Sequence, residues 1–225
     1  MAVLGEHYQR EGILFCLCGP SGSGKSTHCG YLLAQNARTL QFSVSFTTRL
    51  ARAGEVQGED YHFVSKSEFE KRIAQDEFVE WEETHGNYYG TSAKTLEHII
   101  EGGGDLLLEV DIRGALNFKA AYPRNAVIVF MIPPDFETLC QRLTARGEMP
   151  EEELATRLKT TEREYDAFLK VAEQGGGIDY LVINDKIEET SKCLDEILQV
   201  ERRQLNRIAD QSLMKLCMLP ANKKV

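Results

Sequence analysis

The chain has 225 residues, of which 42% are hydrophobic and 27% charged, enough to bury the core of one globular unit. Its formal net charge of −9 argues against non-specific nucleic-acid binding, which needs a broad excess of lysine and arginine. Because no run approaches the roughly 18 apolar residues of a membrane span, we expect a cytoplasmic protein with neither nucleic acid nor membrane as a partner.

The six cysteines are scattered through the chain without a C-x-x-C pair. This spacing favours reduced thiols over a disulfide framework. Cys16 and Cys18 share one face of a predicted strand, so a two-ligand metal site is conceivable there. We predict no metal other than Mg²⁺.

The first motif is an apolar run at 13–18, followed by a glycine-rich loop and a helical pattern that extends to about Arg38. Strand, loop and helix in this order are typical of a P-loop, in which backbone N–H groups surround a polyphosphate at a helix N-terminus. Lys25 is placed to reach the β- and γ-phosphates, and the Ser26 hydroxyl to ligate Mg²⁺. The alternative is a plain glycine turn between a strand and a helix. The predicted ATP-binding residues here are Gly19, Pro20, Ser21, Gly22, Ser23, Gly24, Lys25, Ser26 and Thr27.

The next segment has a different character. Alternation at 41–46 predicts one strand, which a loop rich in glycine and charge separates from a short extended segment ending at Val64. Serines at 65 and 67 are N-cap candidates for a helix to about Gln75, and extended segments are expected at 78–82 and up to Ser92. We therefore predict a small strand-rich subdomain at 43–92, inserted into an α/β frame.

The frame resumes with alternating helices and strands. Helices are expected at 93–101, from 135, at 151–168 and at the C-terminal end, and apolar strands at 106–108, 126–132 and 180–183. This order predicts the α/β class with a doubly wound parallel sheet. The predicted division is core at 1–42, 93–141 and 158–201, the inserted subdomain at 43–92, a lid at 142–157 and a C-terminal extension at 202–225.

Two carboxylates follow the predicted strand at 106–108. Glu109 and Asp111 stand where α/β proteins place ligand groups, at the carboxyl end of the sheet. They are candidate Mg²⁺ ligands beside Ser26, directly or through water. The alternatives are a solvated acidic strand end or, for Asp111, service to the second substrate.

Two groups of arginines are candidates for phosphate binding. Arg49 and Arg52, with the phenols of Tyr61 and Tyr89, could enclose a phosphate, although arginines at this spacing are also common as solvated surface charges.

The second group is on the predicted lid. Arg142 and Arg146 share a helix face, and Arg157 follows on the next helix. Guanidinium groups on a mobile flap could neutralise a phosphoryl group in transfer, or they could be ordinary surface charges of acidic helices.

Several segments, in this order beside the glycine loop, resemble guanylate kinase. The resemblance covers about 12–198, and several of the motifs are specific to that family among P-loop proteins. They are Thr47-Thr48-Arg49…Arg52-Ala-Gly54-Glu55…Asp60-Tyr61, Glu80-Trp81, Gly86-Asn87-Tyr88-Tyr89-Gly90-Thr91-Ser92 and Asp111-Ile-Arg-Gly114.

The resemblance implies a nucleoside monophosphate kinase fold with a GMP-binding subdomain and a helical lid. It implies Mg²⁺-dependent transfer of the ATP γ-phosphoryl group to GMP, with deoxy-GMP as a further acceptor, by a monomer or homodimer. Lys25, Arg49, Arg142, Arg146 and Arg157 would be catalytic, and Asn184 would lie near adenine. The implied GMP-binding residues are Ser45, Arg49, Arg52, Glu55, Tyr61, Glu80, Tyr89, Thr91 and Asp111.

The sequence departs from the family pattern in three places. The lid has Glu148-Met149-Pro150 in place of Arg-Gly-Thr, Glu109 stands where Asp is frequent, and 202–225 has no counterpart. One alternative function is a non-catalytic guanylate-kinase-like module that binds phosphopeptides, which the intact Lys25 and Ser26 disfavour. Another is a P-loop kinase for a different small acceptor, which the segments around Glu80 and Tyr89 disfavour.

Overall fold

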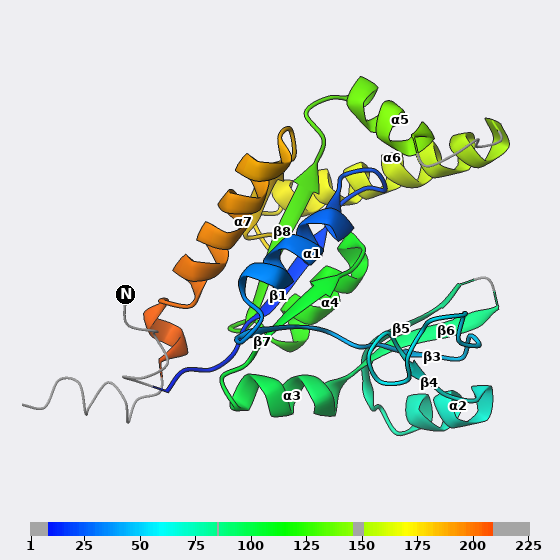
Figure 1. Ribbon diagram of the computed structural model, residues 1–225, viewed down its shortest axis with the longest axis vertical. Coiled ribbons are helices and arrows are strands. Elements are labelled where there is room, and N and C mark those ends of the chain that lie inside the picture. Colours follow the sequence, from blue (N-terminus) through cyan, green and yellow to red (C-terminus); the bar gives the residue numbers. More distant parts are fainter. Residues whose placement is uncertain (1–8, 85, 146–150, 209–225) are drawn as a thin grey trace, which may run out of the picture.

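The fold is built on a five-stranded parallel sheet with helices on both faces (Figure 1). The computed structural model describes residues 9–84, 86–145 and 151–208. All neighbouring strands pair in parallel, which confirms the predicted α/β class and doubly wound sheet. In sheet order the strands are β2 (Leu40–Phe42), β7 (Asp105–Glu109), β1 (Leu14–Cys18), β8 (Ala126–Ile132) and β9 (Tyr180–Ile183).

Strand β1 is buried along its whole length because helices cover both faces of the sheet. Phe15 and Leu17 pack into one core with α1 (Lys25–Gln35) and α7 (Ile187–Glu201). The alternate residues Leu14, Cys16 and Cys18 pack into a second core with α3 (Ala93–Glu101), α4 (Ile112–Ala121) and part of α6 (Glu151–Glu173). A strand covered on both faces has no polar positions, and this explains the continuous apolar run in the sequence.

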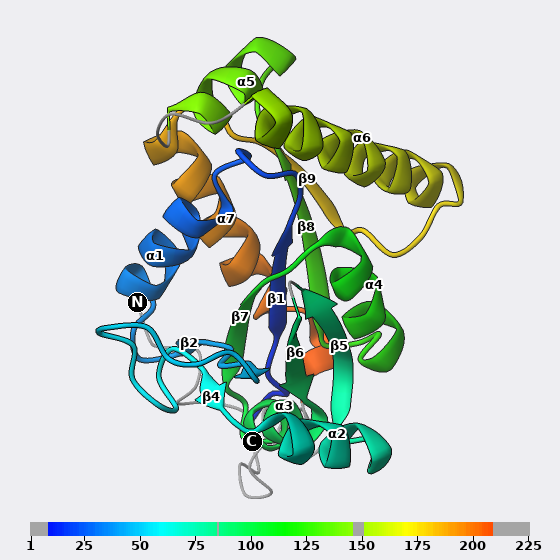
Figure 2. The ribbon, with the colours of Figure 1, turned by 90° about the vertical axis from the view of Figure 1, so that its right-hand side faces the viewer.

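A second, four-stranded sheet stands beside the first (Figure 2). Its order is β4 (His62–Phe63), β3 (Phe46–Thr47), β6 (Asn87–Ser92) and β5 (Phe78–Thr84). Helix α2 (Lys66–Ala74) packs on it through the buried Phe69, whose ring stacks on Phe78 with centroids 4.4 Å apart. All four strands lie within the stretch from 43 to 92, whose status as a separate domain stays a prediction.

The prediction of a single strand at 41–46 is wrong. Leu40–Phe42 pairs with β7 of the first sheet, and Phe46–Thr47 pairs with β4 and β6 of the second. The backbone N–H of Ser43 still donates to the carbonyl of Leu107, and the carbonyl of Ser45 accepts from His62. The chain therefore crosses from one sheet to the other within three residues, where its hydrogen-bond partners change.

Most other predicted elements are present with shifted ends. The first helix ends at Gln35, three residues earlier than predicted, because Asn36 caps it. Helix α6 runs to Glu173, and α5 (Phe136–Thr144) precedes it. Helix α4 was not predicted; its N-cap is Asp111, whose Oδ1 accepts from the N–H of Gly114 at 2.7 Å.

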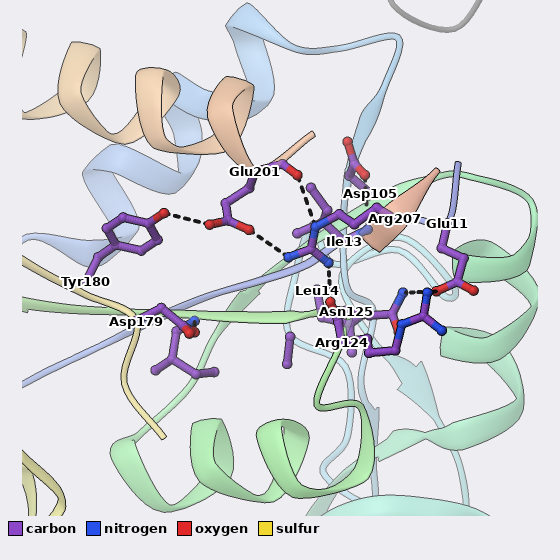
Figure 3. Close-up of polar contacts among 12 residues, drawn as sticks. Glu11, Ile13, Leu14, Asp105, Arg124, Asn125, Asp179, Tyr180, Glu201 and Arg207 are labelled. Carbon is purple, nitrogen blue, oxygen red and sulfur yellow. Dashed lines mark hydrogen bonds and ion pairs between the residues drawn. The ribbon is translucent and has the colours of Figure 1, made fainter. Parts of the chain in front are cut away.

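A cluster of ionic groups joins the C-terminal helix to the amino ends of β1 and β7 (Figure 3). The fully buried Asp105 accepts hydrogen bonds from Arg10, Arg202 and the N–H of Ile13. Beside it, Arg207 donates to Glu201 at 2.6 Å. This places the cluster at the opposite end of the sheet from the glycine loop.

None of the helices within the described residues is long and apolar enough to span a membrane.

Candidate active site

The candidate site is a cavity of about 450 Å³ between the two sheets, at the carboxyl ends of β1 and β7. The glycine loop and the ends of these strands form one wall, β5 and β6 form another, and α6 contributes a third. Residues predicted from sequence that line it are Gly19, Ser21, Gly22, Gly24, Lys25, Ser26, Ser45, Tyr61, Glu80, Tyr89, Glu109 and Asp111.

The glycine loop has a backbone that only glycine tolerates at two points. Gly19 and Gly24 have φ of +134° and +94°, and a Cβ there would lie 2.1 Å from the carbonyl oxygen of Met131 and 2.2 Å from Nδ2 of Asn184. Lys25, the first residue of α1, folds back over this loop. Its Nζ donates to the carbonyls of Gly19 at 2.5 Å and Pro20 at 3.2 Å. Both acceptors are neutral, so the ammonium charge remains available to an anion.

A polar group suited to a hard cation lies next to Lys25. The Ser26 hydroxyl donates to Oε1 of Glu109 at 2.8 Å, and Asp111 lines the same part of the cavity. Hydroxyl and carboxylate oxygens are the ligands that Mg²⁺ prefers, so these residues fit such an ion. One oxygen of Asp111 is already engaged as the α4 cap, which leaves the other for a ligand.

A half-buried carboxylate and two hydroxyls form a hydrogen-bonded row on the second sheet. Thr91 Oγ1 donates to Oε1 of Glu80 at 2.8 Å and lies 3.4 Å from Oγ of Ser45. Since Thr91 has one hydroxyl hydrogen, Ser45 is the donor in the second contact. Burial raises the pKa of Glu80, which the hydrogen bond from Thr91 partly offsets. Such a carboxylate favours a ligand that brings N–H donors to it.

A second polar group lies at the edge of the same sheet. The Arg49 guanidinium donates two hydrogen bonds to Glu55, at 2.8 and 2.9 Å, and it lies 5.4 Å from the centre of the Tyr61 ring. These hydrogen bonds lower the pKa of Glu55 to about 2. Glu55 also accepts from the backbone N–H of Arg52, whose side chain is exposed and does not line the cavity.

The two predicted lid arginines within the described residues, Arg142 and Arg157, do not line the cavity. Arg157 forms an ion pair with Glu153 on its own helix, at 2.9 Å, and Arg142 donates to the carbonyl of Asp185 at 3.4 Å. Arg146 lies outside the described residues. Roles for the two described arginines in phosphoryl transfer stay predictions.

Asn184 lies behind the glycine loop, outside the residues that line the cavity. It is buried, and its Nδ2 donates to the carbonyl of Ser23 at 2.7 Å. His28, on α1, is buried nearby and contacts Oγ of Ser191 at 2.8 Å. In this structure Asn184 therefore supports the loop.

Sequence reasoning missed three polar residues that line the cavity: Glu82, Thr160 and Glu164. Glu82 is two residues after Glu80 on β5, so the strand period of two could have identified it. Thr160 and Glu164 are four residues apart on α6 and share a helix face. Burial raises the pKa of Glu164 to about 7, although Lys25 acts to lower it.

Three comparisons bear on the identity of this site. The family model described as guanylate kinase matches residues 12–201. A guanylate kinase of Clostridium tetani is 39% identical over 91% of this chain and 93% of its own length. One of Desulfitobacterium hafniense is 42% identical over 88% of this chain and 95% of its own length. The crystal structure of guanylate kinase from Anaplasma phagocytophilum matches with a TM-score of 0.69 and 30% identity, covering 93% of this chain and 97% of that one.

Proposed function

This chain belongs to the guanylate kinase family, and from that membership we propose how its cavity divides between two nucleotides. The protein transfers the γ-phosphoryl group of ATP to GMP, giving ADP and GDP. Reactions of this class need a divalent metal ion. The observation that carries the proposal is that the half-buried carboxylate of Glu80 and the ammonium-bearing Lys25 line one cavity.

Guanine binds at the row formed by Glu80, Thr91 and Ser45. Its N1–H and N2–H₂ groups are adjacent donors, which a single carboxylate can accept together. The Thr91 hydroxyl, which donates to Glu80 at 2.8 Å, is then free to turn toward O6, as is that of Ser45. Asp111 lies near enough to Glu80 to raise its pKa, which supports a place for it at the same base.

The GMP phosphate binds between Arg49, Tyr61 and Tyr89. The Tyr61 and Tyr89 ring centroids lie 6.0 Å apart, and Arg49 lies against Tyr61. Glu55 holds the Arg49 fork in place through two hydrogen bonds, which pre-orients it at no entropic cost to the ligand. Arg52 reaches the phosphate only by a side-chain movement from its exposed position.

The ATP phosphates bind in the glycine loop, where Lys25 exchanges its two carbonyl acceptors for phosphate oxygens. Arg142 and Arg157 neutralise the charge on the transferred phosphoryl group after their side chains release the carbonyl of Asp185 and the carboxylate of Glu153. Such a change of partner fits a lid at 142–157 that closes over bound ATP. A role for Asn184 next to adenine needs a comparable local change.

Mg²⁺ is the proposed divalent ion, with Ser26, Glu109 and Asp111 as the residues that would hold it, directly or through water. When bound, it supplies positive charge to the oxygens of the donor phosphates. The proposal rests on the oxygen donors of these three side chains and on the 2.8 Å contact between Ser26 and Glu109.

Catalysis by these residues is positioning and charge stabilisation. The attacking group is a phosphate oxygen of GMP that is already ionised at neutral pH, so it needs no general base. Glu80 and Arg49 fix the acceptor, and Lys25 stabilises the charge that spreads over the donor phosphates. A cytoplasmic location and a monomeric or dimeric state remain proposals. The net charge of −9 bears on partners alone, because it disfavours binding to nucleic acid.

Steady-state assays of ADP release with GMP, AMP, CMP and UMP as acceptors test this assignment. We expect GMP to be preferred by a factor of about 10⁴ or more, because none of the other three bases presents two adjacent donors to Glu80. Chelation of the metal should abolish turnover, and Mg²⁺ should restore it. A preference for AMP, or turnover that survives chelation, contradicts the assignment.

A further inference from the structure

Glu82 is a cavity-lining carboxylate for which the assignment above has no role. It lies on β5 two residues beyond Glu80, so both side chains project from the same face of the strand into the cavity. Its side chain is exposed there, and within the described part of the chain no hydrogen bond or ion pair engages it. Its charge raises the pKa of Glu80. A carboxylate without a partner at this position can accept a hydrogen bond from a bound ligand.

The pairing of β5 with β6 gives the position of Glu82 along the bound nucleotide. Glu80 stands opposite Thr91, at the guanine end, and Glu82 stands opposite Tyr89, at the phosphate end. Two residues along a strand span about 7 Å. The sugar of a nucleoside monophosphate joins base to phosphate, so GMP laid along these strands brings its ribose past Glu82.

The chemistry of the nucleotide indicates which of its groups Glu82 can contact. A carboxylate accepts hydrogen bonds only, and ribose offers hydroxyl donors, whereas the phosphate offers none and repels it. A 2′-hydroxyl present in GMP and absent from deoxy-GMP would give Glu82 a hydrogen-bond donor in one acceptor and none in the other. We propose, on the basis of the proposed function, that Glu82 accepts the 2′-hydroxyl of GMP and makes the enzyme favour GMP over deoxy-GMP.

The experiment compares kcat/KM for GMP and deoxy-GMP in the wild type, Glu82→Gln and Glu82→Ala. Glu83→Gln is the matched control, because it is the adjacent carboxylate, is exposed, and does not line the cavity. We expect the wild type and Glu83→Gln to favour GMP by about 10-fold or more, as for a hydrogen bond to a charged group. Glu82→Ala should lower this ratio to near one, mainly by loss with GMP, and Glu82→Gln should give an intermediate ratio.

Deoxy-GMP turnover retained in Glu82→Ala reports that the variant is folded. An unchanged ratio in Glu82→Ala overturns the inference, as does an equal gain with both acceptors, because the latter means that Glu82 only repels the phosphate. Failure of the proposed function is a different result: the wild type would not use GMP in preference to other bases at all.

Discussion

At the scale of single residues, Lys25 combines a full charge with weak neutral partners. Its Nζ contacts only the carbonyl oxygens of Gly19 and Pro20 among the described residues. Replacing it with Ala removes a charge from the phosphate site and touches no core residue. We expect turnover to fall by about 10² or more, equivalent to about 3 kcal/mol, with thermal unfolding little changed. Coupled measurement of ADP release decides this, and near-normal turnover would show that the loop does not hold the reacting phosphates.

Glu80 carries the second prediction at this scale. Glu80→Gln keeps the size of the side chain, but it places an amide donor against the donors of guanine and removes a half-buried charge. We expect kcat/KM for GMP to fall at least about 10-fold, on the order of 1.4 kcal/mol, while the low rate with AMP changes little. Because burial raises the pKa of Glu80, KM for GMP in the wild type should also rise as the pH falls toward that pKa.

Steady-state kinetics with GMP and AMP over a pH series measure both effects. In Glu80→Gln the rise in KM at low pH should disappear, since the variant has no carboxyl to protonate at this position. An unchanged efficiency with GMP would mean that Glu80 does not contact the base.

At the scale of elements, a helix or strand can be predicted from the sequence when its own residues show the hydrophobic pattern of that element. The run at 126–132 is apolar throughout because β8 is buried on both faces, and the strand was predicted with the bounds it has. The β2–β3 boundary could not be found in this way, since it depends on which distant strand accepts each N–H. Helix α4 has an N-cap signal in Asp111, but the same acidic residue also fits a ligand motif, so the sequence does not distinguish the two roles.

The same limit applies to the site. The glycine loop is predicted because its motif is contiguous in the chain, whereas Ser45, Glu80 and Thr91 are implied by the resemblance to guanylate kinase. Thr160 and Glu164 reach the cavity only because α6 packs across the end of the sheet, and no local pattern distinguishes them from the other polar residues of that helix. The partners of Arg157 and Arg142 likewise depend on how α5 and α6 are placed.

Helix α6 carries a prediction about pH and stability. Glu164 has a pKa of about 7 in the folded protein, against an ordinary value of 4.5, chiefly because of burial. Between these values the folded state binds more protons than the unfolded state, so the contribution of this group to stability declines as the pH rises through the interval and is lost above about 7. Discounted for partial exposure to solvent, the loss is about 1 kcal/mol.

Glu164→Gln keeps an acceptor and removes the titration. We therefore compare the Tm of Glu164→Gln minus the Tm of the wild type at two pH values. We expect this difference to be about 2–4 °C larger at pH 8 than at pH 4.5. Thermal unfolding of both proteins across this range measures the difference. A constant offset between the two curves contradicts the assigned pKa.

At the scale of the whole molecule, function and stability are concentrated at opposite ends of the first sheet. The carboxyl ends of its strands carry the exposed ligand groups, and the amino ends carry the buried ionic cluster of Figure 3. In that cluster Glu201 accepts from Tyr180 and Arg207, and Arg207 also donates to the carbonyl of Arg124. Residues 202–208 are thus held to the sheet by ion pairs and hydrogen bonds.

The cluster allows stability to be changed without changing the site. Arg207→Ala leaves the buried carboxylate of Glu201 without its cation, and breaking a buried pair in this way costs about 3–5 kcal/mol. In a chain of this size, this lowers Tm by roughly 6–20 °C.

The matched control is Glu189→Gln, which breaks the exposed pair with Lys186 and should cost less than about 1 kcal/mol. Replacing both Glu201 and Arg207 with Leu should recover much of the loss, because no charge is then left unpaired. Calorimetry of the four proteins, with GMP turnover measured well below each Tm, tests the separation: a large loss of turnover in folded Arg207→Ala would show that the two ends of the sheet are coupled.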